Sequence, residues 1–422
     1  MTYWFTNPIV RNLIPLASAT ALKGLSSTFT VPAIVMGANA LPEGRGLGMT
    51  LVDRLALRCA KKRAFLVTDE NAANHAGRVA RALEGGQFAT ETWSRVEPEA
   101  PLENVRACAD AMTQFEPDVI AAIGGGSVMD SAKAAWVLYE RPDIKDLANI
   151  TPIAPIGLRK KAFLVAFPTT SGTGSECTGI AVVSDMAAKR KVPLVSSELF
   201  PDFAVLVPDF AMGMPPKLTA GTGLDALTHA MDNVTSYTSN ELCDALALKA
   251  IEMIFRYLPR AYRFPRDREA RLRMHIAATM AGIAFSNGGV AVTHSLGHAL
   301  GKLYAVHHGM AVGIFLPYAL QFYAPVSDKF LEVCRALDIR EDSREKNLDA
   351  LVSRVRRLTE ELDVPTDLKG LGIPRDEWEA KLDTLSLYAF EDPANFQSAR
   401  PPTLEETRRL LEYAYDGKDV DF

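Results

Sequence analysis

Short apolar runs rich in β-branched residues alternate with helical stretches through the first half of the chain. The runs have the length of buried strands, and three of them end in a polar or glycine-rich turn. Such an alternation predicts a mostly parallel sheet with helices on both faces. The expected strands are 63–68, 118–123, 163–167, 182–184 and 204–207, and the expected helices between them include 76–84 and 127–138.

The pattern changes beyond Met214-Pro-Pro216. From Leu218 to the C-terminus, apolar residues recur at helical spacing, as in 240–257 and 345–362, and β-branched runs are rare. A chain of 422 residues also exceeds one ordinary domain. We therefore predict an α/β domain over 1–214 and an all-helical domain over 215–422, with the hinge at Met-Pro-Pro.

Composition narrows the class of protein. Hydrophobic residues make up 48% and charged residues 23%, which is typical of a globular protein, and the net charge of −5 without a long basic run argues against nucleic-acid binding. The five cysteines are widely separated and contain no C-x-x-C, as expected for reduced thiols in a cytoplasm. The moderately apolar segment 9–25 lacks a basic n-region, and no apolar run has the length of a convincing membrane span. We expect a cytoplasmic protein without nucleic-acid or membrane partners.

Two polar loops follow predicted strands. The strand at 118–123 runs into Gly124-Gly-Gly-Ser127 and then a helix, an order that offers free backbone N–H groups and a positive dipole end to a pyrophosphate. A loop rich in hydroxyl groups and glycine, 168–176, follows the strand at 163–167. Asp69 follows the first strand, where a carboxylate can bond a ribose diol and repel a 2′-phosphate, which favours NAD over NADP. Taken alone, a glycine triplet also occurs in tight turns, and Asp69 is also typical of a helix N-cap.

Histidine is scarce and clustered. Four of the seven histidines lie within 294–308, and His229 follows Asp225 at a spacing that places both on one helix face. The same spacing relates His294 and His298. Carboxylate and imidazole together favour iron or zinc over calcium or magnesium. The cluster predicts a metal centre, but spacing alone leaves open which of His294, His298, His307 and His308 bind.

Four motifs in this order resemble the iron-containing (group III) alcohol dehydrogenase family, from Val31 to the last helix. The likeness is greatest to the alcohol dehydrogenase half of the bifunctional aldehyde–alcohol dehydrogenases. The motifs are Gly124-Gly-Gly-Ser-Val-Met-Asp-Ser-Ala-Lys133, Pro168-Thr-Thr-Ser-Gly-Thr-Gly-Ser-Glu176, Gly223-Leu-Asp-Ala-Leu-Thr-His-Ala230, and His294-Ser-Leu-Gly-His298 with His308-Gly.

The resemblance implies a function and a site. The metal, Fe(II) or alternatively Zn(II), would polarise an alcohol or carbonyl oxygen while hydride passes to or from the nicotinamide of NAD. Its ligands would be Asp225, His229, His294 and His308, with His298 as a catalytic proton relay. The α/β domain would bind the dinucleotide and the helical domain the metal, with the site between them. The implied nucleotide-binding residues are Asp69, Gly125, Gly126, Ser127, Asp130, Ser131, Thr169, Thr170, Thr173, Thr178, Val182 and Lys191.

Two departures from the family pattern stand out. His307 adds an imidazole beside His308, where relatives often carry proline or another residue that is not a ligand. We expect His307 either to lie at the surface or behind the ligands, or to replace His308 as the ligand. Glu99 stands where many relatives carry Asn or Asp near the cofactor. The residues before Val31 exceed many relatives and receive no function. An edge strand near the N-terminus favours a homodimer or higher homo-oligomer.

Two other functions compete with an alcohol dehydrogenase. The first is a cyclase that resembles dehydroquinate synthase and uses NAD and zinc, but it needs a basic cluster for a substrate phosphate, and residues 225–308 contain only scattered Arg and Lys. The second is a non-catalytic nucleotide-binding protein of the same fold, against which the complete ligand set argues. The sequence favours neither, and it leaves the particular alcohol or aldehyde open.

Overall fold

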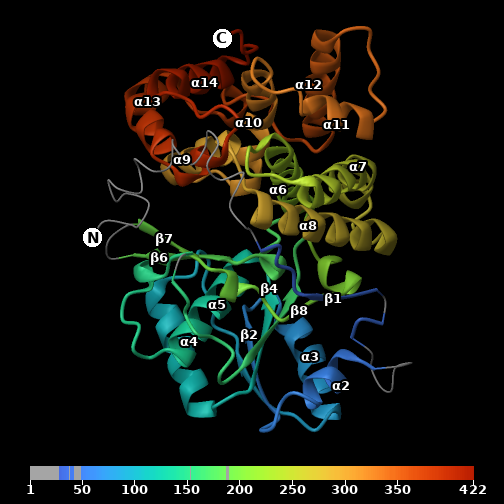
Figure 1. Cartoon of the computed structure of the whole chain (residues 1–422), viewed down its shortest axis with the longest axis vertical. Helices are drawn as coiled ribbons and strands as arrows, with labels where there is room; N and C mark the ends of the chain where they lie inside the picture. The colour runs from blue at the N-terminus through green and yellow to red at the C-terminus, as the bar shows by residue number, and fades with distance from the viewer. Residues whose placement is uncertain (1–27, 38, 42–48, 153, 187–189) are drawn as a thin grey trace. The chain divides into compact units, whose positions relative to one another are not determined.

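The computed structural model describes residues 28–37, 39–41, 49–152, 154–186 and 190–422. The apolar segment at 9–25 and most of the chain before Val31 lie outside these residues. The described chain separates into two compact units, Thr30–Gly213 and Met214–Phe422 (Figure 1). The second unit begins at the Met-Pro-Pro sequence.

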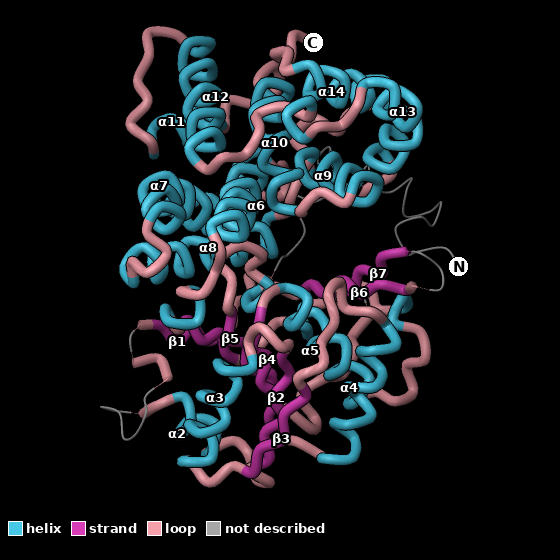
Figure 2. The backbone as a smooth tube through the Cα atoms, turned by 180° about the vertical axis from the view of Figure 1, so that it is seen from behind, coloured by secondary structure: helices cyan, strands magenta, loops and turns pink. Residues whose placement is uncertain are grey.

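The first unit is built on a six-stranded sheet in which all paired strands are parallel, in the order β1-β8-β5-β4-β2-β3 (Figure 2). The three apolar runs with the clearest sequence signal form the adjacent strands β5, β4 and β2. The strands are β1 (Ala33–Met36), β2 (Arg63–Thr68), β3 (Ala89–Trp93), β4 (Val119–Gly124), β5 (Phe163–Pro168) and β8 (Phe203–Leu206).

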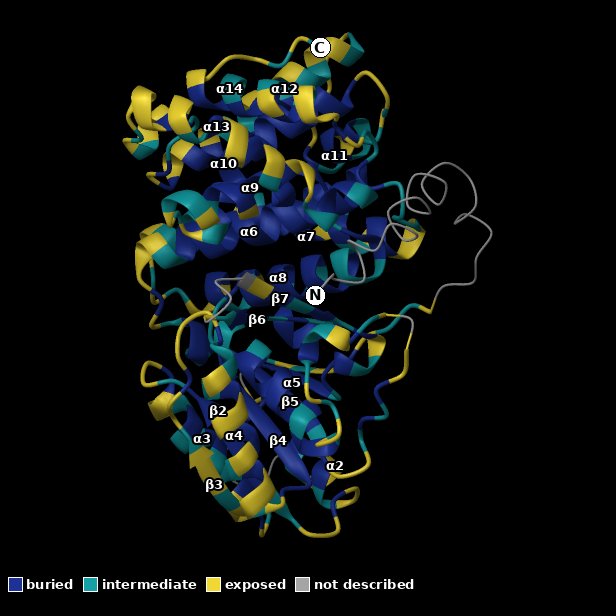
Figure 3. Cartoon of the chain, turned by 90° about the vertical axis from the view of Figure 1, so that its left-hand side faces the viewer, coloured by how far each residue is buried: buried dark blue, intermediate teal, exposed yellow. Residues whose placement is uncertain are grey.

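Helices cover both faces of this sheet. Along β4, Ile120 and Ala122 join a core with α4 and α5, whereas Ala121 and Ile123 join a second core with α2 and α3. Because both faces are covered, the central strands are apolar throughout instead of alternating, and they are buried in Figure 3. The helices are α2 (Leu51–Ala56), α3 (Ala73–Gly85), α4 (Leu102–Phe115) and α5 (Gly126–Glu140), with short 3-10 turns η4 (Leu147–Asn149), η5 (Ser175–Cys177), η6 (Ser197–Leu199) and η7 (Pro208–Ala211).

The β-rich run at 182–184 is not part of the parallel sheet. It lies in β6 (Ile180–Asp185), which pairs antiparallel with β7 (Arg190–Val195) as a separate two-stranded sheet. Ala181 and Val183 are fully buried in the core that contains α5, while their neighbours Ile180 and Val182 are only partly buried. One covered face is typical of an antiparallel hairpin, and this accounts for the difference from the central strands.

All regular elements of the second unit in the described residues are helices, and they share one apolar core. The prediction of an α/β unit followed by a helical one is therefore confirmed. No single helix among the described residues is long and apolar enough to cross a membrane; α8 and α9 pass that test only as a pair, and they are bent by 106°. The helices are α6 (Pro216–Thr235), α7 (Glu241–Arg263), α8 (Arg268–Gly288), α9 (Val292–Tyr304), α10 (His308–Tyr323), α11 (Phe330–Ala336), α12 (Arg344–Glu361), α13 (Arg375–Phe390) and α14 (Leu404–Asp416), with η8 (Lys369–Leu371) and η9 (Pro393–Gln397).

Candidate metal centre and nucleotide site

Helix α6 carries the first two predicted metal ligands. It is buried on every side from Thr219 to Thr235, so its polar side chains face other helices instead of water. Asp225 and His229 lie one turn apart, with His229 Nε2 3.8 Å from Asp225 Oδ1, and their side chains are 3% and 6% exposed. The i, i+4 spacing read from the sequence thus brings both groups to one point.

Helices α9 and α10 bring further imidazoles to that point. The ligand atoms of Asp225, His229 and His294 lie within 4.8 Å of one another, and the rings of His229 and His294 stack at 4.7 Å between centroids. His308, the first residue of α10, lies outside this compact group of three. Its Nε2 is nevertheless 3.3 Å from Asp225 Oδ1, at the half-exposed edge of the group.

The three buried residues fit a metal ion. Asp225 Oδ1 and His294 Nε2 are buried and have no hydrogen-bond partner among the described residues, apart from the 3.3 Å contact of Oδ1 with His308 Nε2. The nitrogen of His229 that faces Asp225 Oδ1 is Nε2, at 3.8 Å. A buried polar atom without a partner costs about 1–3 kcal/mol, and a ligand shared by the three residues would offset this cost. A divalent cation accepts their lone pairs, and one carboxylate with imidazoles suits iron or zinc.

Protonation favours the same conclusion. Burial lowers the pKa of His229 to about 3 and holds the pKa of His294 well below its ordinary value, so both rings are neutral at neutral pH. Burial alone would raise the pKa of Asp225, but the nearby imidazoles of His229 and His308 hold it well below its ordinary range. The group is therefore already in the deprotonated state that metal binding requires.

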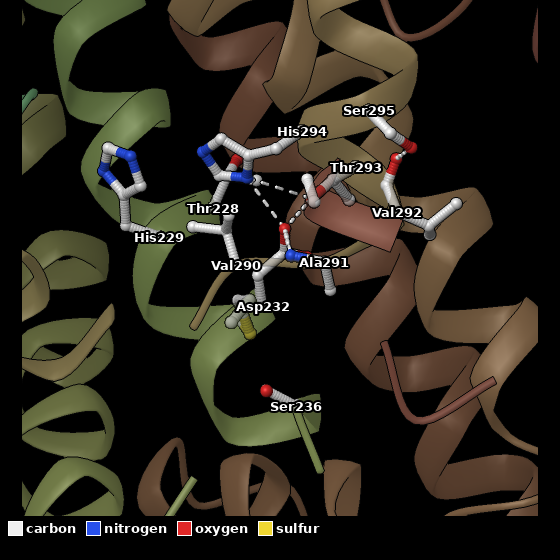
Figure 4. Close-up of polar contacts among 12 residues, drawn as sticks. Thr228, His229, Asp232, Ser236, Val290, Ala291, Val292, Thr293, His294 and Ser295 are labelled. Carbon is white, nitrogen blue, oxygen red and sulfur yellow. Dashed lines mark hydrogen bonds and ion pairs between the residues drawn. The ribbon is translucent and has the colours of Figure 1, made fainter. Parts of the chain in front are cut away.

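A second buried carboxylate, Asp232, contacts His294 at the ring nitrogen Nδ1 (Figure 4). Its Oδ2 accepts hydrogen bonds from His294 Nδ1 at 2.8 Å, from the backbone N–H of Ala291 at 2.8 Å and from the hydroxyl of Thr293. Burial raises the pKa of Asp232 to about 6. The sequence interpretation missed Asp232, although its position three residues after His229 places it on the same face of α6.

The first unit brings the predicted nucleotide-binding loops to one edge of its sheet. The chain passes from β2 outward to β3 and then returns to the other side of β2 as β4, so the strand order reverses between β2 and β4. In parallel sheets ligands bind in the crevice beyond the carboxyl ends of the strands at such a point. Thr68 pairs with Ile123, and Gly124 pairs with Pro168, so Asp69 and both polar loops emerge at this edge.

The glycine loop leads directly into α5. Gly125 is the N-cap of this helix, and no side chain among the described residues caps its first N–H groups. A Cβ on Gly125 would lie 3.3 Å from Thr170, and one on Gly126 would lie 3.1 Å from Thr173. The two loops therefore pack closely, with little room for a Cβ at either glycine, and together they form a polar cradle suited to a pyrophosphate.

Two family models match the chain in succession, one over each unit. Residues 45–208 match the family described as iron-containing alcohol dehydrogenase, and residues 219–415 match the C-terminal part of the Fe-containing alcohol dehydrogenase family. An NADPH-dependent butanol dehydrogenase of Clostridium saccharobutylicum is 39% identical over 78% of this chain and 84% of its own length. The chain belongs to the iron-containing alcohol dehydrogenase family.

Other relatives support the assignment. The bifunctional aldehyde-alcohol dehydrogenase AdhE of Escherichia coli is 34% identical over 85% of this chain, which spans 43% of that longer enzyme. The solved structure of a 1,3-propanediol oxidoreductase superposes with a TM-score of 0.83 at 27% identity, over 92% of this chain and all of that one. The chain is thus an iron-type, NAD(P)-dependent alcohol dehydrogenase or aldehyde reductase.

The family resemblance assigns His298 as a proton relay, and its ring lies beside the candidate ligands His294 and His308. Its ring stacks on His308 at 5.2 Å between centroids, its side chain is 46% exposed, and its Nδ1 is 2.9 Å from Asp392 Oδ2. The sequence interpretation missed Asp392, which lies 94 residues away in the chain with no local signal. The additional imidazole of His307 packs over Gly221, where a Cβ would come within 2.7 Å of Nδ1.

Several residues that the family resemblance assigns to the nucleotide form an internal network instead of open donors. The fully buried Lys133 donates to the Thr178 hydroxyl at 3.2 Å and to the Ile180 carbonyl at 2.7 Å. Asp130 accepts from the Ser175 hydroxyl at 2.9 Å and from the backbone N–H of Val182 at 3.0 Å. This network holds the β6–β7 hairpin against α5.

The remaining predicted nucleotide-binding residues make contacts of their own. Asp69 accepts a hydrogen bond from the backbone N–H of Ala72 at 2.8 Å, which caps the turn before α3. Thr169 donates its N–H to the Gly124 carbonyl, and Ser131 is fully buried, with no hydrogen-bond partner for its hydroxyl among the described residues. Lys191 pairs with Glu99 at 3.3 Å, and the N–H of Glu99 donates to the Ser127 hydroxyl.

Proposed function

We propose that the chain is an NAD(H)-linked, Fe(II)-dependent alcohol dehydrogenase or aldehyde reductase, with Zn(II) as the alternative metal. The observation that carries the metal assignment is the convergence of the buried ligand atoms of Asp225, His229 and His294, which lie within 4.8 Å of one another, with His308 as the fourth ligand. We assign nucleotide binding to a domain over 1–214 and metal binding to one over 215–422. The protein acts in the cytoplasm as a homo-oligomer, and the free edge of β1 carries the exposed Ile34 and Met36.

The chemistry follows from these groups. When bound, the metal supplies Lewis-acid polarisation of the alcohol or carbonyl oxygen. His298 exchanges the alcohol proton through Nε2, because Asp392 holds its Nδ1. We expect His298→Ala to lower turnover and change its pH profile while the metal stays bound; full turnover with an unchanged profile would rule out the relay.

The cofactor assignment rests on Asp69. Its carboxylate lies beyond β2, beside the glycine loop that follows β4, where a charge would repel the 2′-phosphate of NADP. The butanol dehydrogenase relative is NADPH-dependent, so cofactor choice varies among similar proteins. The residues that complete the proposed nucleotide site are Gly125, Gly126, Ser127, Ser131, Thr169, Thr170, Thr173 and Lys191. We assign Asp130, Thr178 and Val182 to the same site through the network that holds the β6–β7 hairpin against α5.

The test is oxidation of NADH by small aldehydes with protein purified without oxygen. Metal-free, Fe(II)-loaded and Zn(II)-loaded samples are compared, each with NADH and with NADPH. We expect turnover that requires metal, is fastest with Fe(II) and NADH, and is lost in His294→Ala. NADH binding without turnover under any metal would contradict the proposal and favour the cyclase or the non-catalytic protein.

A further inference from the structure

The two ring nitrogens of His294 face different partners. Nδ1 lies 2.8 Å from Asp232 Oδ2, while Nε2 is buried with no hydrogen-bond partner in the described part of the chain. The side chains of His294 and Asp232 are only 3% and 1% exposed, so water does not compete for the bond. Figure 4 shows the ring between Asp232 on one side and His229 on the other.

The same carboxylate oxygen also fixes the start of α9. Ala291, the N-cap of α9, donates its backbone N–H to Asp232 Oδ2, and Thr293 in the first turn donates its hydroxyl. An ionised carboxylate only accepts hydrogen bonds, so Nδ1 of His294 must carry the proton and Nε2 must present its lone pair. Asp232 therefore determines both where the ring lies and which nitrogen is free to coordinate.

We infer that Asp232 is a positioning residue that fixes the tautomer of His294 and so strengthens metal binding at this centre. The inference rests on the proposed function, because it takes His294 as a ligand. Carboxylates hydrogen-bonded to a ligating histidine orient the ring and raise its basicity, and their loss typically costs about 10–100-fold in metal affinity. The competing explanation is that Asp232 only docks α9 against α6.

The affinity of metal-free protein for Zn(II), measured by competition with a chromogenic chelator, tests the inference without an activity assay. We expect Asp232→Asn to weaken binding about 10–100-fold, and Asp232→Glu to weaken it less because the charge remains. Thr293→Val is the matched control: it removes another hydrogen bond to the same oxygen but leaves the bond to His294. If Thr293→Val weakens binding as much as Asp232→Asn, the docking explanation holds and the inference is overturned.

A double-mutant cycle separates action through His294 from a general structural effect. In a His294→Ala background the ring is absent, so adding Asp232→Asn should cost little further Zn(II) affinity. Losses that simply add would overturn the inference. Wild-type protein that binds no Zn(II) would instead refute the metal site of the proposed function, so the two failures are distinguishable.

One further measurement needs no substitution at Asp232, and it decides the question even if Asp232→Asn does not fold. Metal-free protein labelled with ¹⁵N-histidine should already show the His294 ring protonated at Nδ1, with its resonance assigned by its loss in His294→Ala. A ring protonated at Nε2 would overturn the inference.

Discussion

We propose that the carboxylate of Asp69 discriminates between NAD and NADP in the proposed nucleotide site. Asp69 Oδ1 accepts the backbone N–H of Ala72, so replacing the residue with alanine would also remove a cap. Asp69→Asn keeps an oxygen at that position and removes only the charge. We expect it to raise the NADPH-to-NADH ratio of kcat/KM at least about tenfold, since about 1.4 kcal/mol of repulsion corresponds to a factor of ten. Steady-state kinetics with both cofactors measures it; an unchanged ratio would mean that Asp69 is only a cap.

Gly309 allows the start of α10, and with it His308, to pack close to Asp225 on α6. A Cβ at this position would collide with the carbonyl oxygen of Gly221 and lie 2.8 Å from the Cβ of Asp225. Gly309→Ala should therefore move His308 away from Asp225, destabilise the protein by about 1–3 kcal/mol and lower its metal content. Thermal unfolding and metal analysis check this.

A matched control for Gly309→Ala is Gly85→Ala in α3, where a Cβ meets no atom within 4 Å. This variant should keep its metal content and be at least as stable as the wild type, because alanine favours a helix more than glycine does. Equal metal content in both variants would show that the approach of α10 to α6 does not position His308.

At the scale of whole elements, the network around Lys133 makes the free energy of unfolding of the α/β unit depend on pH. Burial lowers the pKa of Lys133 to about 8 from its usual 10.5. Between these values the unfolded chain binds more protons than the folded one, so this group's contribution to stability rises with pH and is least favourable below pH 8.

The prediction compares the wild type with Lys133→Met from neutral pH to about pH 10. The difference in free energy of unfolding, wild type minus variant, should increase across this window by about 3 kcal/mol at most. Lys61→Met, at a position where the side chain is 52% exposed, is the control and should show no such increase. Urea unfolding at several pH values measures both, and a flat difference for Lys133→Met would contradict the lowered pKa.

The elements also explain which predictions the sequence could support. The strands β2, β4 and β5 are covered on both faces, so their continuous apolar runs predict buried strands. In contrast, β3 at the sheet edge has the largely exposed sequence Ala-Thr-Glu-Thr-Trp, which does not predict a strand. Asp225 and His229 share one helix, so their spacing alone brought them together. Spacing could not separate His294 from His298, because burial against α6 distinguishes them: their side chains are 3% and 46% exposed.

At the scale of the whole molecule, we expect each of the two compact units to be stabilised by its own ligand. The three buried candidate metal ligands lie in the helical unit, on α6 and α9, and the glycine loop with its polar partner lies in the α/β unit. A ligand that binds only the folded state stabilises it by RT ln(1 + [L]/Kd), about 2.7 kcal/mol at a hundredfold excess over Kd. Local unfolding of the backbone near each site should be suppressed most by the ligand that binds at that site.

Hydrogen exchange with mass spectrometry tests this separation. Removing the metal with a chelator should speed amide exchange most in α6 and the first turns of α9 and α10, because the buried side chains of Asp225, His229 and His294 then lose their common ligand. Adding NADH to metal-free protein should slow exchange most at the start of α5 and in the 168–176 loop. A uniform change over both units in either experiment would show that they open together, and the stability of each site would then belong to the whole chain.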